Sequence, residues 1–321
     1  MTLRLRQLVA ACAFAAFASP SLSMVPCDAG SVRIISPHGS GVSDLMARVL
    51  AAELSVRMGK SFYVEPVIGA GGAIGMRALA EAAPDGCTLG IVGLSTLVIA
   101  PEVEDNVGYD PQADFSPVAM IGGSPAMFAV KADLGITSFA GLIEAMKSNG
   151  LVPTVSTPGR TTITAILPAT IFDREGIEAV IVPFKDSSEA LIAAAQGDVD
   201  AVSLSYSTMR PQIEAGALVP LYVSAPQRLP ELPNVPTLAE IGQTDLETLI
   251  WFGLAGPDGM DPEMASELNT EVNAILQDSD AAKPLLSANV SLMLMSPEEM
   301  SGMISRQTAA YAPAIKKLGQ K

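Results

Sequence analysis

A glycine- and serine-rich loop near the start of the chain has the composition of a site that grips a small anion. The loop spans 36–43 and precedes a helix that we predict to be capped by Asp44. A helix N-terminus carries about half a positive charge and unpaired N–H donors, and glycines let the backbone approach a ligand closely. We assign ligand contacts to this loop, against the alternative of a plain strand-to-helix turn. The candidate residues are Ser36, His38, Gly39, Ser40, Gly41, Ser43 and Asp44.

Further polar residues follow the predicted strands at 88–92, 154–156, 180–182 and 201–204. The carboxyl ends of parallel strands meet at one edge of a sheet, where ligands of α/β proteins bind. The alternatives are a helix cap for Ser95 and Thr96, and a solvated arginine for Arg160. The candidates at these strand ends are Ser95, Thr96, Thr157, Gly159, Arg160, Thr161, Thr162, Lys185, Ser205 and Tyr206.

The same residues offer little for catalysis. His38 is the only histidine, and it either donates to a ligand and senses pH or has no role. No Gly-x-Ser-x-Gly motif accompanies it, and one histidine with few cysteines leaves only carboxylates as metal ligands. The run 69–75 (Gly-Ala-Gly-Gly-Ala-Ile-Gly) has isoleucine at 74, where a dinucleotide fingerprint needs glycine, so tight strand-to-helix packing explains it better. We expect no cofactor, no metal and no enzymatic activity, and keep a hydrolase as an alternative.

The elements that carry these residues alternate between strand and helix. This alternation predicts a parallel, doubly wound α/β sheet, and a proline-rich stretch over 226–236 interrupts it. Two such units and a return segment fit two lobes with a ligand between them. The remaining predicted strands are 31–35, 62–64, 127–130, 221–223 and 251–255; the predicted helices begin at 44 and span 73–82, 139–147, a segment ending at 172, 188–196, and the chain after 255.

The N-terminus is typical of an exported protein. Arg4 and Arg6 precede an apolar run over 8–17, and small residues follow, so 1–23 reads as a signal peptide cleaved near Ser23. The apolar run is about ten residues, whereas a membrane span needs about 20, and the residues before Cys27 make a poor lipoprotein box. The formal charge is −15, and losing the two arginines makes it −17. So acidic a chain argues against nucleic acid and anionic lipid as partners.

The order and spacing of several short motifs resemble the Bug family, the extracytoplasmic binding components of tripartite tricarboxylate transporters. The resemblance covers nearly the whole chain after residue 23. The motifs are Asp44-Leu-Met-Ala-Arg48, Gly69–Gly75, Ala83-Pro-Asp-Gly86, Tyr109-Asp-Pro111 with Asp114-Phe115 and Pro117-Val118, Val182-Pro-Phe-Lys185, Gly197-Asp-Val-Asp200, Leu232–Gly242 and Trp251-Phe-Gly253.

The resemblance implies a periplasmic-binding-protein type II fold, a carboxylate ligand held by lobe closure, and membrane transporter subunits as partners. It places lobe 1 at 24–126 plus 226–321 and lobe 2 at 127–225, in a periplasmic monomer. A ligand-loaded sensor for a membrane kinase is an alternative output. In the family, the loop over 36–43 and the junction at 156–162 are the two jaws that grip the carboxylate.

This chain departs from the family in the lining of both jaws. Ser36 and Ser40 add hydroxyls to the first jaw, and Arg160 stands where the family has glycine in the second. An inward Arg160 would pair with a carboxylate through two hydrogen bonds. Asp186 replaces a small residue and partly neutralises Lys185. The altered lining means that the ligand of a relative should not be assigned to this chain.

The resemblance also implies a disulfide between Cys27 and Cys87. Each cysteine precedes one of two strands that are parallel neighbours in a type II lobe. The bond would close a loop of about 60 residues and stabilise the fold by about 4 kcal/mol in the chain-entropy model.

Overall fold

The computed structural model describes residues 27, 30–104, 106–150 and 152–319 of the 321-residue chain. The predicted signal peptide, 1–23, lies outside these residues. Within the described ranges, no helix is both long and apolar enough to span a membrane.

The first part of the chain alternates strand and helix up to a long strand. Its elements are β1 Ser31–Ser36, α1 Gly41–Met58, β2 Ser61–Pro66, the 3-10 helix η1 Ala70–Gly72, α2 Ala73–Ala80, β3 Thr88–Gly93, the π-helix η2 Ser95–Ile99, α3 Ala100–Val103 and β4 Phe115–Lys131. The middle part contains the 3-10 helix η3 Ala132–Leu134, α4 Phe139–Asn149, β5 Thr154–Thr157, α5 Ile163–Arg174, β6 Val180–Pro183, α6 Ser187–Gln196, β7 Ala201–Ser205, α7 Tyr206–Glu214 and β8 Leu218–Val223.

The chain then returns along β4 and ends in helices. This last part contains the 3-10 helices η4 Ala239–Ile241 and η5 Thr244–Leu246, then β9 Leu249–Pro257, α8 Pro262–Gln277, α9 Lys283–Ser287, β10 Ser291–Leu292 and α10 Pro297–Gly319. The prediction of helix throughout the end of the chain missed the short strand β10, which pairs with β4.

The strands form one mixed sheet in the order β2-β1-β3-β9-β4-β7-β5-β6, with β8 and β10 also paired to β4. The α/β fold class is confirmed, but the expectation of an entirely parallel sheet is wrong. β1, β2 and β3 are parallel to one another, as are β5, β6 and β7, whereas β9 and β4 run antiparallel to their neighbours. The two antiparallel strands are the connections by which the chain crosses the molecule and returns.

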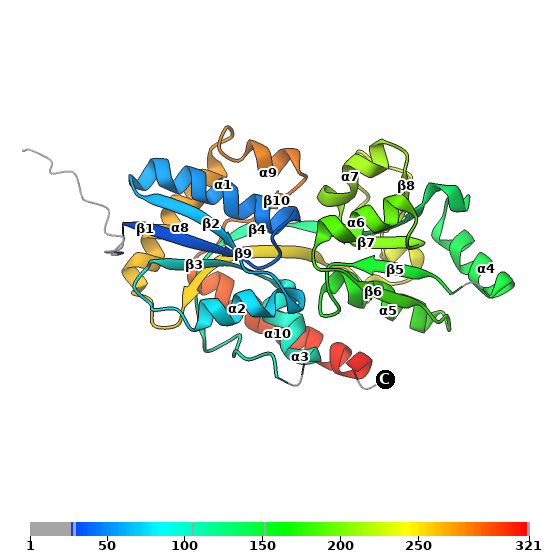
Figure 1. The fold of residues 1–321 in the computed structure, drawn as a ribbon, viewed down its shortest axis with the longest axis horizontal. Coiled ribbons are helices and arrows are strands. Elements are labelled where there is room, and N and C mark those ends of the chain that lie inside the picture. Colours follow the sequence, from blue (N-terminus) through cyan, green and yellow to red (C-terminus); the bar gives the residue numbers. More distant parts are fainter. Residues whose placement is uncertain (1–26, 28–29, 105, 151, 320–321) are drawn as a thin grey trace, which may run out of the picture.

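β4 divides the molecule into two halves, which Figure 1 shows side by side. We call β1, β2, β3, β9, β10 and their helices the first half, and β5 to β8 with their helices the second half. α1 and α9 cover one face of the first half, and α2, α3 and α10 cover the other. The second half places α6 and α7 on one face and α5 on the opposite face.

Apolar side chains fill both halves. The larger core cluster runs through Ile34, Leu89, Phe128 and Leu254, and a smaller one lies between the sheet and helices α6 and α7. Gly75 fits the packing interpretation of its motif, because an ideal Cβ there would lie 2.8 Å from Val67 O. A side chain at this position would push α2 away from the strand before it.

The helix that follows the first loop begins earlier than predicted. Ser40 is the N-cap of α1, with extended backbone, and Asp44 lies inside the first turn, where it pairs with Arg48. The expected cap at Asp44 is therefore wrong. α1 begins at Gly41, so the loop before it is shorter than predicted.

The disulfide between Cys27 and Cys87 is present, as predicted, with a Cα–Cα distance of 4.9 Å. β1 and β3 are parallel neighbours, and Arg33 N donates to Cys87 O at 3.0 Å. The bond ties the start of the described chain to the edge of the first half.

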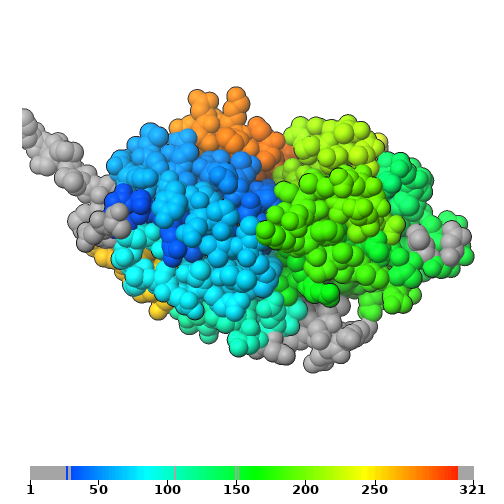
Figure 2. All heavy atoms as spheres, viewed as in Figure 1, coloured from blue at the N-terminus to red at the C-terminus, as the bar shows by residue number. Residues whose placement is uncertain are grey.

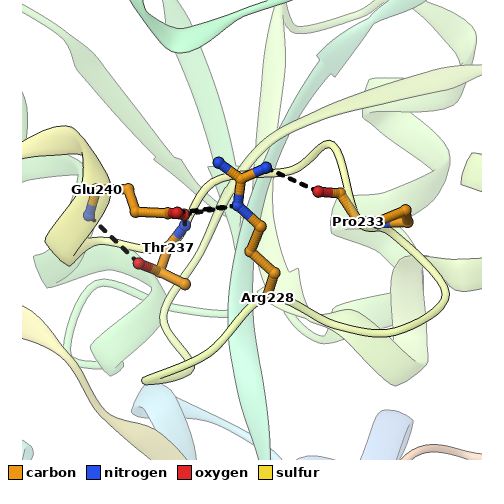
Figure 3. A network of polar contacts seen from close by, with 4 residues as sticks. All are labelled: Arg228, Pro233, Thr237 and Glu240. Carbon is orange, nitrogen blue, oxygen red and sulfur yellow. Dashed lines mark hydrogen bonds and ion pairs between the residues drawn. The ribbon is translucent and has the colours of Figure 1, made fainter.

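Polar contacts fix the proline-rich segment that joins β8 to β9 (Figure 3). Arg228 donates from Nε to both carboxylate oxygens of Glu240, at 3.0 and 2.8 Å, and from Nη1 to Pro233 O at 2.7 Å. Thr237 and Glu240 exchange hydrogen bonds between backbone N–H and side-chain oxygen. These bonds hold the pKa of the Glu240 carboxyl below its usual range. The segment is thus held by side chains where proline prevents a regular ladder.

Candidate functional site

A cavity of about 50 Å³ lies between the two halves. The first half, including the crossing strand β9, supplies His38, Ser40, Val42, Ser43, Ser95, Ile250 and Phe252, and the second half supplies Pro158, Thr162, Ile163, Thr164, Ser187, Leu204 and Ser205. Within the described part of the chain, this lining contains no carboxylate, ammonium or guanidinium group.

Several helices point their N-termini at this cavity. The lining includes the first residue or the N-cap of each of four helices, α1, α5, α6 and α7. α6 is capped by the Asp186 side chain, which accepts from Ser188 N and Glu189 N. The other three lack a side-chain cap bond. Their N–H donors and dipoles therefore make the cavity electropositive without any charged side chain.

Three serines of the first jaw have hydroxyls without a hydrogen-bond partner among the described residues, and two of them, Ser40 and Ser43, line the cavity, whereas Ser36 does not. Ser43 is only 2 % exposed, lines the cavity, and makes no hydrogen bond to any described residue. Ser40 Oγ is buried and likewise has no partner among the described residues. A buried hydroxyl without a partner costs free energy. A bound group that accepts hydrogen bonds from Ser40 and Ser43 would remove this cost.

The structure brings six of the predicted site residues to the cavity. They are His38, Ser40, Ser43, Ser95, Thr162 and Ser205. Thr162 Oγ1 contacts Thr164 Oγ1 at 2.9 Å, and Ser205 Oγ contacts Ser207 and Thr208. The hydroxyls from the second half are thus oriented by neighbours, whereas those of Ser40 and Ser43 are not.

Other predicted residues support the jaws without lining the cavity. Ser36 is buried under the first loop. Thr96 Oγ1 accepts from Gly93 N and donates to Gly93 O, which ties η2 to the end of β3 without capping a helix. Thr157 Oγ1 donates to Gly159 O, and Thr161 is buried against Gly71. Gly39 and Gly41 have positive φ and shape the first loop.

Four predicted residues with longer or charged side chains lie away from the cavity. Arg160 and Lys185 are exposed, and Asp44 accepts from Arg48 Nε at 2.7 Å. Tyr206 is buried in the smaller core cluster, and burial raises its pKa. Each follows the expected strand or loop, but its side chain turns toward solvent or core.

Sequence reasoning missed the apolar part of the lining. Val42, Pro158, Ile163, Leu204, Ile250 and Phe252 line the cavity beside the polar Thr164 and Ser187. Ile250 and Phe252 alternate along β9 and so face the same side of the strand. The Trp251-Phe-Gly253 motif, which contains Phe252, was the sequence signal that could have identified the β9 part of the lining. For Ser187, the signal was its position two residues after Lys185, a predicted site residue.

The two halves touch around the cavity. Ile163 N donates to Ser95 Oγ at 3.2 Å, and Arg210 Nη1 donates to Ser287 O at 3.1 Å. An ideal Cβ on Gly159 would lie 3.1 Å from Gly71 Cα. In the space-filling view the two halves meet along their boundary (Figure 2). The two halves are therefore in contact around the cavity in this structure.

His38 is neutral in this environment. The residue keeps partial exposure, but burial of its ring among protein atoms lowers the pKa to about 4. Gly72 leaves room for this ring, because an ideal Cβ there would lie 3.0 Å from His38 Cε1. At neutral pH the ring therefore offers one donor and one acceptor, without charge.

Tyr109 braces the helical turn that carries Ser95. Its hydroxyl donates to Thr96 O within η2, and burial, reinforced by Glu104, raises its pKa far above the usual range. The phenol is thus a permanent donor. Among the described residues, no group of three or more metal-ligating side chains could hold a metal ion.

Comparison with known proteins places this geometry in context. The model of the tripartite tricarboxylate transporter family receptor matches residues 46–320. Protein BugT of Bordetella pertussis is 28 % identical over 300 residues, which cover 90 % of each chain.

Solved structures share the fold over nearly the same length. The periplasmic binding protein BugD is 25 % identical with a TM-score of 0.84, covering 90 % of this chain and 97 % of its own. An R. palustris protein solved with adipate is 29 % identical with a TM-score of 0.85, with the same coverage of both chains.

Proposed function

The chain belongs to the tripartite tricarboxylate transporter receptor family, and from this we propose that it is a solute-binding protein that captures a small carboxylate-bearing molecule. The bound molecule would be handed to membrane transporter subunits. The relative solved with adipate supports a carboxylate as the ligand class. Binding rather than catalysis is the activity that we propose.

The observation that carries the proposal is the convergence of uncapped helix N-termini on a neutral cavity. Anions bind at such ends because N–H donors and helix dipoles both favour negative charge. Ser43 and Ser40 add hydroxyls that lack protein partners. We propose that these groups, with His38, Thr162 and Ser205, hold the carboxylate.

We further propose that the two halves are lobes that open and close around the ligand. Their boundaries would lie near 126/127 and 225/226, where β4 and the segment after β8 pass between them. Contacts such as Ile163 N to Ser95 Oγ form only when the jaws approach. A ligand that bonds to both jaws shifts the equilibrium toward closure.

The location that we propose is the periplasm, with 1–23 removed as a signal peptide. The named relative BugD is a periplasmic binding protein, which supports this location. The closed shape would be what the membrane subunits recognise. The acidic chain is suited to remaining free of anionic lipid and nucleic acid between encounters.

A thermal-shift and calorimetry screen of residues 24–321 with carboxylates tests the proposal. Ligand at 100 times its Kd should stabilise the protein by about 2.7 kcal/mol. Ser43→Asp should abolish the shift, because it places a negative charge in the cavity. Ser188→Asp is the matched control, since exposed Ser188 lies in the first turn of α6 outside the cavity. No shift with any carboxylate, or turnover of an ester or amide, would overturn the proposal.

A further inference from the structure

The cavity between the two halves is small for the ligands of carboxylate-binding proteins. Its volume is about 50 Å³. A single water needs about 10–15 Å³ in this measure, so the space corresponds to roughly three to five water-sized positions. A carboxylate group occupies most of them, which leaves room for a tail of roughly one to three carbon atoms.

Part of the cavity lining is apolar. Ile250 and Phe252 of β9 face the cavity from the crossing strand, and Leu204 faces it from the end of β7. All three are less than one-tenth exposed. Their side chains offer no donor to a second polar group, whereas an alkyl chain placed against them is removed from water.

A second carboxylate has no cationic partner here. Arg160 and Lys185, the two cationic residues predicted to bind the ligand, are both exposed and absent from the lining. The unused helix dipoles can offset one negative charge. A second charge against the apolar part of the lining would be desolvated without compensation, which is costly in a protein interior.

Resting on the proposed function, we propose that the ligand of the closed state is a short-chain monocarboxylate with an apolar tail. The carboxylate lies at the N-termini of α1, α5 and α7, and the tail lies against Leu204, Ile250 and Phe252. The small volume and the uncompensated second charge disfavour dicarboxylates and tricarboxylates. This specificity differs from that of the relative solved with adipate.

Titration calorimetry on residues 24–321 distinguishes the alternatives. The probes are acetate, propionate and butyrate against succinate, malate, adipate and citrate at pH 7. Propionate or butyrate should bind most tightly, and the dicarboxylates about 100-fold more weakly, because their second charge stays unpaired. A dicarboxylate or citrate binding at least as tightly would overturn this inference and leave the proposed function standing. Absence of binding by every carboxylate would overturn both.

Truncation of the apolar part of the lining tests where the tail lies. Leu204→Ala should shift the preference toward hexanoate over propionate by about tenfold or more, since each methylene newly buried is worth about fourfold in affinity. Val202→Ala is the matched control, because Val202 is a buried β7 residue outside the lining. Leu204→Val gives a milder truncation if the alanine variant fails to fold, with a smaller shift in the same direction. An unchanged preference in a folded Leu204 variant would refute the assigned tail position.

Discussion

Replacing Ser43 by alanine separates ligand binding from stability. Ser43 is 2 % exposed, lines the cavity, and has no hydrogen-bond partner among the described residues. Its removal deletes a donor that only the ligand uses. A hydrogen bond to a charged group is worth about 1.5–3 kcal/mol, so ligand affinity should fall by about 10- to 150-fold. The ligand-free protein should lose no stability.

Ser156 is the reciprocal control for Ser43. It is fully buried, lies outside the cavity, and its Oγ contacts Ala190 O at 2.8 Å and Ala201 O at 3.3 Å. Ser156→Ala leaves these oxygens without that donor, and should cost about 1–3 kcal/mol of stability. Its ligand affinity should stay unchanged, because Ser156, although the first residue of the second jaw, does not line the cavity.

The assay is urea unfolding of the ligand-free variants together with calorimetric titration of each with the tightest-binding carboxylate. The reasoning predicts opposite patterns: Ser43→Ala changes Kd alone, and Ser156→Ala changes the free energy of unfolding alone. Equal loss of stability in both variants would refute the claim that Ser43 lacks a protein partner. An unchanged Kd in Ser43→Ala would refute its role in the site.

Three further outcomes follow from the described contacts. Replacing Cys27 and Cys87 together by alanine should lower the free energy of unfolding by about 4 kcal/mol, measured in urea, without changing Kd, because the bond lies at the edge of the first half. Gly159→Ala should weaken binding about tenfold, because the added methyl group would hold the jaws apart. Gly176→Ala, also at positive φ but in open space, should leave binding unchanged. Equal losses of affinity in the two variants, measured by calorimetry, would count against closure at this contact. His38 has a pKa of about 4 in the folded state, below its unfolded value of about 6.5, so the unfolded state binds more protons between these values. The contribution of His38 to stability is therefore full above about pH 6.5 and lost as pH falls toward 4. Between these pH values, the free energy of unfolding measured in urea should fall less for His38→Gln than for the unchanged protein.

Much of the fold follows from local patterns in the chain. The strands at 31–35, 88–92 and 201–204 were predicted within one residue of β1, β3 and β7. These strands are short apolar runs bounded by turn residues. Such a run identifies a strand that is buried on both faces of a sheet even when its neighbouring strands are unknown.

The crossing elements were harder to predict because their sequences oppose their structure. β4 extends from Phe115 to Lys131, although only 127–130 was predicted as strand. Pro117, Pro125 and the pair Gly122-Gly123 weaken a strand pattern, and the strand accommodates them with register shifts against β9. α7 was missed because Pro211 lies inside it and few of its residues are apolar. Tertiary pairing decides both elements.

The site was predicted in position but only partly in composition. Polar residues at strand ends reached the cavity where the side chain was short, as for Ser95 and Ser205. Arg160 and Lys185 come from junctions of the same kind, after β5 and β6, yet they are exposed. A loop position fixes where the backbone lies and leaves the direction of a long side chain to packing. The apolar part of the lining from β9 was invisible because buried strand residues look alike whether they face core or cavity.

A crystal structure of residues 24–321 with propionate tests the central claim most directly. The account predicts that the carboxylate lies between the two halves and accepts hydrogen bonds from Ser43 Oγ and from backbone N–H groups at the start of α1, with no arginine or lysine in contact. A carboxylate held by Arg160 or Lys185, or bound outside the cavity between the jaws, would contradict it.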